Sequence, residues 1–114
     1  MIETDSKKRK EESNRIEKRK RERELSDIRA ISLIPEGRRF IWRILEDAKV
    51  FASCYDRHNG DMSFYEGKRD LGLMVWRDVI ISVPEKYVQM VNEHESDRKR
   101  EEKERIEFEK KLSE

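Results

Sequence analysis

The stretch PEGRRFIWRILEDAKVF, residues 35 to 51, combines a helix start with apolar residues at helical spacing. Pro35 suits the first position of a helix, and Glu36 lies in the positively polarised first turn. Apolar side chains then recur at intervals of three and four, which is the period of one helix face. The stretch therefore predicts an amphipathic helix near residues 36–52. Its predicted apolar face consists of Phe40, Ile41, Ile44, Leu45, Ala48 and Phe51.

A second Pro-Glu pair predicts another helix start at Pro84, and the residue before this proline is expected to end the preceding helix. That preceding segment, about 63–82, also carries apolar residues at helical spacing. A turn-rich segment around Asn59-Gly60 separates it from the first amphipathic helix. We therefore expect these helices to share one core. Its predicted members are Phe40, Ile44, Leu45, Leu71, Val75, Val79, Tyr87 and Val91.

Both ends of the chain are highly charged. From Lys7 to about Ser32 the sequence lacks Gly and Pro and is rich in Glu, Lys and Arg, which favour a helix near 7–32. Opposite charges recur four residues apart, and such pairs support an exposed helix. The pattern returns after Asn92, so the helix that starts at Pro84 is expected to continue to about residue 112. Its last turns carry a modest apolar patch of Ile106, Phe108 and Leu112.

The predicted fold is therefore all-α, with about three core helices flanked by long charged helices. The 114 residues allow one domain at most, and nearly all large apolar residues fall in its middle sixty. A core of that size is close to the lower limit for a chain that folds alone, so a partner or self-association would help. The predicted divisions are a charged N-terminal helix at 1–33, a helical domain at 34–93 and a charged C-terminal rod at 94–114.

The composition argues against a membrane-spanning protein, a secreted protein and a protein held by an internal disulfide. The 27 basic and 26 acidic residues nearly balance, and no apolar run approaches the roughly 20 residues of a membrane span. The N-terminus lacks the apolar core of a secretion signal. A single cysteine, Cys54, excludes an intramolecular disulfide and fits a reducing compartment.

Motifs for catalysis are not evident. The sequence has no glycine-rich phosphate loop, nucleophile elbow or histidine pair at metal spacing. The nearest approach to a metal site is a cluster in the turn segment, where Asp and Asn are expected for turn geometry alone. We therefore predict no enzyme activity, no catalytic residue, no metal and no cofactor. The cluster consists of Cys54, Asp56, His58 and Asp61.

The tetrapeptide Glu-Gly-basic-Arg occurs twice, at 36–39 and at 66–69, each time before an apolar run that ends in Trp-Arg. Glycine costs a helix about 1 kcal/mol relative to alanine, so close backbone approach at both glycines is a reasonable explanation. The arginines would then pair with acids over the two indoles. The alternative is that the arginines face outward to a partner. The residues concerned are Gly37, Arg39, Trp42, Gly67, Arg69 and Trp76.

Several blocks in this order resemble a family of small tailed-bacteriophage proteins. The blocks are EGRRFIWRILE at 36–46, VF at 50–51, FYEGKRDLGL at 64–73 and PEKY at 84–87. The family is the Bbp-nineteen-like phage domain, which is named after a Bordetella phage protein. The resemblance covers about residues 35–93 and leaves the charged ends outside.

The resemblance implies a small protein encoded among phage structural genes, with no catalytic residues to transfer. It would be made in the host cytoplasm and reside in the virion, in several copies within a symmetric assembly. Its expected partners are other phage structural proteins of the portal, internal core or scaffold type. The candidate core or interaction residues are Arg39, Trp42, Arg43, Glu46, Glu66, Gly67, Arg69 and Gly72, together with Trp76.

A nucleic-acid-binding accessory protein is the alternative function. The basic residues of the N-terminal helix would contact phosphates, and DNA contact would then occur through this helix. Interleaved acids argue against it, because such binding depends on net neutralisation of phosphate charge. The candidate phosphate contacts are Lys7, Lys8, Arg9, Lys10, Lys18, Arg19, Lys20 and Arg21.

Overall fold

The computed structural model describes residues 2–51 and 59–114. These residues form four helices and, within the two ranges, no strand, which confirms the predicted all-α class. The molecule is elongated, with extents of 87 × 39 × 15 Å. The helices are α1 (Ile2–Ser32), α2 (Pro35–Asp47), α3 (Asn59–Ser82) and α4 (Pro84–Ser113).

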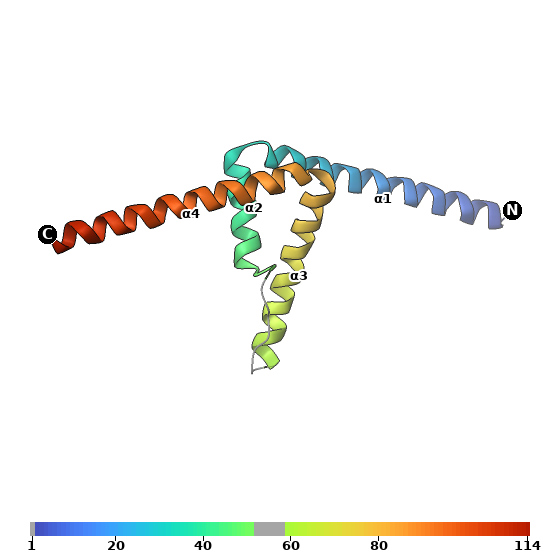
Figure 1. Ribbon diagram of the computed structural model, residues 1–114. Helices are drawn as coiled ribbons and strands as arrows, with labels where there is room; N and C mark the ends of the chain where they lie inside the picture. The colour runs from blue at the N-terminus through green and yellow to red at the C-terminus, as the bar shows by residue number, and fades with distance from the viewer. Residues whose placement is uncertain (1, 52–58) are drawn as a thin grey trace.

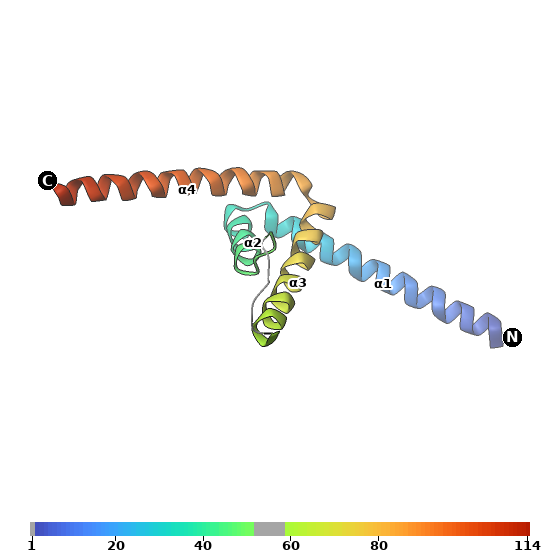
Figure 2. The same ribbon diagram turned by 60° about the horizontal axis from the view of Figure 1, so that its bottom comes forward.

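The helices are arranged like the letter T (Figure 1). We call the region where the four helices meet the hub. α1 and α4 extend from the hub in opposite directions, so the two chain termini lie at opposite ends of the molecule (Figures 1 and 2). α2 and α3 project from the hub and form the stem. None of the described helices is long and apolar enough to cross a membrane.

Two prolines set the starts of α2 and α4, as predicted. Ile34 has an extended backbone, with φ −108° and ψ 144°, and Pro35 then occupies the first turn of α2. Val83 likewise leaves the helical region before Pro84 opens α4. A residue before proline is sterically pushed out of the α region, and this separates α1 from α2 and α3 from α4.

α2 ends at Asp47, earlier than the predicted end near residue 52. Lys49 takes the left-handed conformation, with φ 53°. Its amide donates to the Glu46 carbonyl, and the Val50 amide donates to the Leu45 carbonyl. These two bonds form a Schellman motif, which usually has glycine at the left-handed position. Because a lysine occupies that position here, the sequence carried no signal for the helix end.

The core lies where all four helices meet. Leu45 and Val79 are buried, as predicted, whereas Ile44, Val75 and Tyr87 are only partly buried. The buried apolar residues are Ile41, Leu45, Ala48, Val50, Val79, Val83 and Met90.

The predicted burial was wrong for three residues: Phe40, Leu71 and Val91 are 50%, 59% and 37% exposed. Each lies on a helix that buries a neighbouring position instead. α2 turns Ile41 inward rather than Phe40, and α4 turns Met90 inward rather than Val91. Successive residues of a helix differ by about 100° in direction, so the rotation of the helix about its axis decides which of two such neighbours is buried.

The last turns of α1 belong to the hub. The Arg21 guanidinium pairs with the Asp78 carboxylate of α3 at 2.6 Å, and the Ser82 hydroxyl donates to the Leu25 carbonyl at 2.7 Å. Ser32 is fully buried. In contrast, residues 3–20 of α1 and residues 98–114, which form the end of α4 and the last residue of the sequence, are all exposed. We call these two exposed segments the N-terminal rod and the C-terminal rod.

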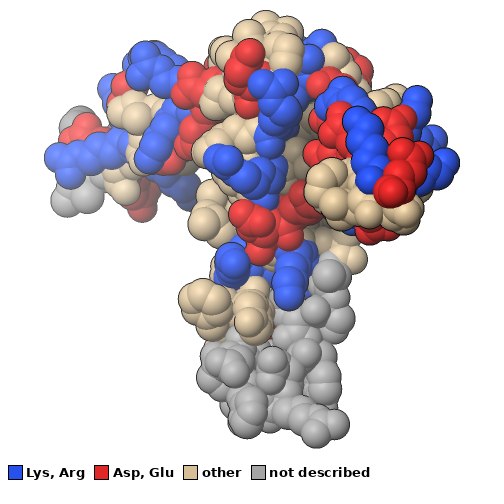
Figure 3. Space-filling model, turned by 90° about the vertical axis from the view of Figure 1, so that its left-hand side faces the viewer, with Lys and Arg blue, Asp and Glu red and all other residues tan. Residues whose placement is uncertain are grey.

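Ion pairs along the rods join residues three apart, such as Arg15 with Glu12 and Arg100 with Asp97. The sequence had suggested pairs four apart; both spacings lie on the same side of a helix. Ile106, Phe108 and Leu112 are exposed in the C-terminal rod, as expected for this chain alone. Figure 3 shows acidic and basic side chains interspersed on the face that it presents.

Candidate functional site

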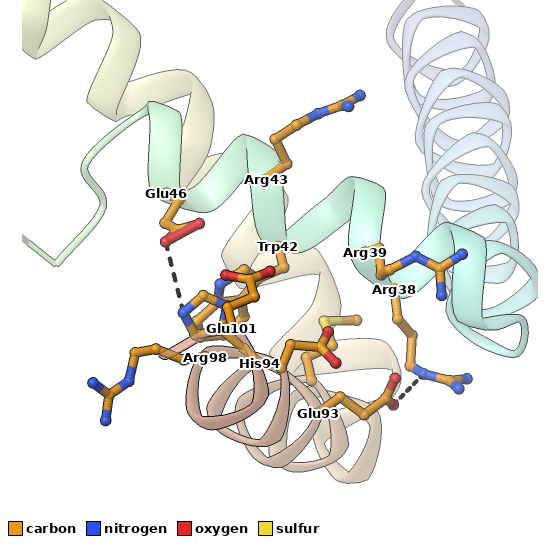
Figure 4. Close-up of a pocket in the computed structure, with 11 residues that line it drawn as sticks. Arg38, Arg39, Trp42, Arg43, Glu46, Glu93, His94, Arg98 and Glu101 are labelled. Atoms are coloured by element: carbon orange, nitrogen blue, oxygen red, sulfur yellow. Dashed lines mark hydrogen bonds and ion pairs between the residues drawn. The ribbon is translucent and has the colours of Figure 1, made fainter. Parts of the chain in front are cut away.

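A groove of about 500 Å³ separates α2 from α4 (Figure 4). Four residues of the motif predicted from the sequence line it: Arg39, Trp42, Arg43 and Glu46. From α4 the lining includes charged side chains and one histidine. These α4 residues are Met90, Glu93, His94, Asp97, Arg98 and Glu101, and Arg38 completes the lining.

A partly buried ion pair lies at one end of this groove. The Arg38 side chain is 8% exposed, and its Nε donates to Glu93 Oε1 at 2.6 Å. Its Nη1 donates to the Ser32 carbonyl at 3.1 Å, at the end of α1. A buried charge is costly unless it is paired and hydrogen-bonded. Arg38 therefore ties α1, α2 and α4 together at one point.

The middle of the groove is formed by Trp42 and His94. Their ring centroids are 4.7 Å apart, with planes inclined by 31°. The Glu46 carboxylate lies 3.7 Å from His94 Nε2, so the pair is ionic when His94 is protonated. Figure 4 shows this contact bridging α2 and α4. Trp42 and Glu46 thus act mainly between helices of the same chain.

The arginines at the rim are exposed. Arg39 is 60% exposed and lies 3.9 Å from Glu36, whereas the Arg43 guanidinium lies 5.4 Å from the centroid of the Phe40 ring. The expectation that a partly buried Arg39 would pair with an acid over an indole was wrong, because Arg39 is exposed and the acid beside it is Glu36. Arg38, the residue before Arg39, takes the buried position because α2 turns this neighbour towards α1 and α4.

Ion pairing also affects the acid–base properties beside the groove. Arg98 Nη2 donates to Glu95 Oε1 at 2.7 Å. This hydrogen bond lowers the pKa of Glu95 and raises the pKa of Arg98. Both side chains are exposed, so the pair mainly fixes the direction of Arg98 on the surface.

The second half of the motif lies on α3 and does not reach the groove. Gly72 packs against the end of α2, where a Cβ would lie 2.7 Å from Val50 Cγ2. Arg69 Nε donates to the Val50 carbonyl at 3.3 Å. Glu66 and Gly67 are exposed. The structure therefore separates the predicted residues into a groove set on α2 and a packing set on α3.

The prediction of close approach at both glycines was half right. A Cβ on Gly37 would overlap the Ile31 carbonyl, so the α1–α2 turn requires glycine there. A Cβ on Gly67 would meet nothing within 4 Å. The two glycines differ in their position along their helices. Gly37 lies just after the tight turn between α1 and α2, whereas Gly67 lies inside α3, which starts earlier than predicted. Gly72 is the glycine of α3 that permits close packing.

An aromatic cluster joins the stem to α4. Trp76 makes edge contacts with Phe51 and Tyr87, at centroid distances of 6.0 and 6.3 Å. Tyr87 also lies 6.5 Å from Trp42. The indole nitrogens of Trp42 and Trp76 are buried without a hydrogen-bond acceptor among the described residues. The cluster is therefore held by ring packing rather than by polar contacts.

The basic residues proposed as phosphate contacts are exposed along α1, with one exception. Arg21 is held by Asp78 and Glu24, so its charge is already balanced within the chain. The cluster of Cys54, Asp56, His58 and Asp61 lies outside the residues whose side chains are described. Among the side chains that are described, no group of three or more His, Cys, Asp or Glu residues is arranged to hold a metal.

The comparisons with known proteins agree with the blocks seen in the sequence. A family model described as Bbp19-like phage protein matches residues 29–92, which is more than half of the chain. The match contains α2, α3, the end of α1 and the first turns of α4. A search of curated proteins and a search of solved structures found no match. The chain belongs to the family of Bbp19-like phage proteins.

Proposed function

We propose that this phage protein is a non-enzymatic component of the virion or of its assembly. Its hub would dock on a larger complex, near the portal or in the internal core that is ejected with the genome. The rods would lie along neighbouring subunits or a channel. The proposal rests on one observation above all: about a third of the chain forms exposed helix that buries no side chain in the hub.

Free-standing helix is unfavourable unless something supports it. Isolated helices of this length are marginal in water, and exposed ion pairs add only a few tenths of a kcal/mol each. The C-terminal rod also exposes Phe108 and Leu112 at 60% and 70%. Burial of two such side chains against a neighbour would contribute several kcal/mol. A partner in an assembly supplies that surface.

The hub gives a second reason to expect a partner. At the α1–α2 turn the apolar residues Leu33, Ile34 and Phe40 are each at least half exposed. Larger apolar areas on a small soluble protein often mark interaction sites. Repeated copies around a symmetric ring would cover such areas on every subunit.

Mass spectrometry of purified particles, before and after genome release, tests the proposal directly. We expect the protein in full particles, and its loss on genome release would place it in the ejected core. Retention would favour a position at the portal. Absence from full particles and from assembly intermediates alike would contradict the proposal.

A matched pair of variants tests the role of the rod. Phe108→Ser should lower incorporation into particles while leaving the melting temperature of the purified protein unchanged, since Phe108 makes no hub contact. Phe108→Leu keeps an apolar side chain and should be incorporated normally. Equal incorporation of both variants would show that the rod does not carry the docking contact.

DNA binding remains the competing function, and the exposure of the basic residues of α1 favours it. Residues 1–31 carry eleven basic and eight acidic side chains, so their net charge is small for a phosphate-binding segment. Titration with duplex DNA at several salt concentrations separates the two functions. A salt slope of several units with tight binding would favour DNA, whereas weak binding at physiological salt supports the assembly role.

A further inference from the structure

α3 carries a row of exposed apolar side chains, which we call the seam. Phe64, Leu71, Met74 and Ile81 are each between 52% and 65% exposed. Together with Gly67, which is exposed, and Asp78, which is 14% exposed beside Arg21 of α1, they alternate at spacings of three and four along α3. That alternation averages 3.5 residues, which is the spacing of the contact positions in a coiled coil. The seam spans about 26 Å of helix.

The flank of this seam carries one acid and one base. Asp70 directly precedes the seam residue Leu71, and Arg77 directly precedes the seam residue Asp78. Asp70 and Arg77 are seven residues apart and therefore lie on one side of the helix. Both are exposed, and neither has an ion-pair partner among the described residues. On the opposite flank, Lys68 and Val75 carry no such complementary pair.

We propose that the seam binds a second copy of this chain, with the two α3 helices antiparallel. In this arrangement the flanks that precede the seam positions face each other. Asp70 of one copy then lies opposite Arg77 of the second, and the contact repeats by twofold symmetry. Opposite charges beside a helical seam set the orientation of the pair.

The antiparallel register also matches the seam residues by size. Leu71 packs on Met74 of the second copy, and Phe64 packs on Ile81. The remaining layer places Gly67 against Asp78 of the second copy. Asp78 is the residue that holds Arg21 of α1, so the partner must leave room where α1 crosses α3. Glycine has no side chain and leaves that room, and within the single chain a Cβ on Gly67 would meet nothing within 4 Å.

A parallel pair lacks these matches. It would place Asp78 against Asp78 of the second copy and Gly67 against Gly67, leaving like charges together and a gap beside them. Its facing flanks would set Asp70 opposite Val75, so neither Asp70 nor Arg77 would gain a partner. The antiparallel pair therefore satisfies the free charges, and the parallel pair does not.

Charge exchange in the whole 114-residue chain tests the pairing, because it does not depend on any role in the virion. Sedimentation equilibrium over the micromolar range should show a reversible dimer of the natural chain. Asp70→Arg and Arg77→Asp should each raise the dissociation constant at least tenfold, because each places like charges opposite one another twice. Mixing the two variants should restore a dimer of about the original affinity, since each supplies the charge that the other needs.

Glu66→Arg is the matched control, because it makes the same charge change at an exposed position of α3 outside the seam. It should leave the dissociation constant within twofold of the natural value. Circular dichroism and melting should be the same for all variants, since the substituted side chains are exposed. Leu71→Asp should abolish the dimer without unfolding the chain.

Three results would overturn the proposal. The first is a natural chain that stays monomeric throughout the micromolar range. The second is a Glu66→Arg variant that weakens the dimer as much as Asp70→Arg does. The third is a failure of the two charge variants to associate when mixed. A monomeric chain whose Leu71→Asp variant is excluded from particles would assign the seam to a different phage protein.

Discussion

The two copies of Glu-Gly-basic-Arg have opposite surroundings. In 36–39 the glycine and the following arginine, Arg38, are buried at the junction of α1, α2 and α4. In 66–69 the glycine faces open space, and Arg69 donates a hydrogen bond to the Val50 carbonyl. The same four-residue pattern therefore stabilises the hub in one place and borders an exposed seam in the other. Sequence repetition did not imply a repeated role.

The largest expected difference between the copies is steric. Gly37→Ala should lower the free energy of unfolding by about 3 kcal/mol, because its Cβ would overlap the Ile31 backbone, which cannot move without disturbing the α1–α2 turn. Chemical denaturation measures the change. A loss below about 0.5 kcal/mol would mean that this turn adjusts freely, which would remove the distinction between the copies.

The next difference is electrostatic. Glu93→Ala leaves the Arg38 guanidinium buried without its carboxylate, and we expect a loss of about 2 kcal/mol. Glu93 is partly exposed, and the Ser32 carbonyl still accepts from Arg38, so the loss should stay below that of a fully buried pair. Glu66→Ala is the matched change in the second copy and should alter stability by less than about 0.5 kcal/mol. Similar losses in both variants would contradict the contrast.

A change of opposite sign is expected at the second glycine. Gly67→Ala should raise stability by about 0.5–1 kcal/mol, because alanine favours helix and its Cβ meets nothing. Melting at a concentration where the chain is monomeric gives the relevant value. A loss of stability would show that Gly67 is packed in the monomer after all.

The smallest expected effect concerns the ion pair of Glu95 and Arg98, where the C-terminal rod begins. Arg98 lowers the pKa of Glu95, so this pair contributes stability at neutral pH that is lost as the pH falls through the lowered pKa. An NMR titration should find that Arg98→Gln moves the Glu95 pKa upward, towards its ordinary value. An unchanged midpoint would show that the pair does not persist in solution. Global unfolding should be insensitive to this variant, because both side chains are exposed.

The helices themselves could be predicted from local features of the sequence. Proline positions, apolar spacing and charge pairs act within a few residues, and they gave the four helices and the exposed ends with small errors. The end of α2 was not predicted correctly, because Lys49 takes the left-handed conformation that glycine usually occupies at a helix end. Most of the groove set on α2 was also found, since those residues belong to the blocks that resemble the phage family.

What local chemistry did not determine is which neighbour each helix face meets. Arg38 rather than Arg39 is buried, and Gly72 rather than Gly67 is packed, because the positions of α1, α2 and α4 select one side of each helix. Adjacent residues have almost the same local propensity, yet they point about 100° apart on a helix. The sequence alone thus determined an all-α phage protein with charged ends. The tertiary structure alone decided which arginine is buried and which apolar seam stays open, because those outcomes depend on contacts between distant segments.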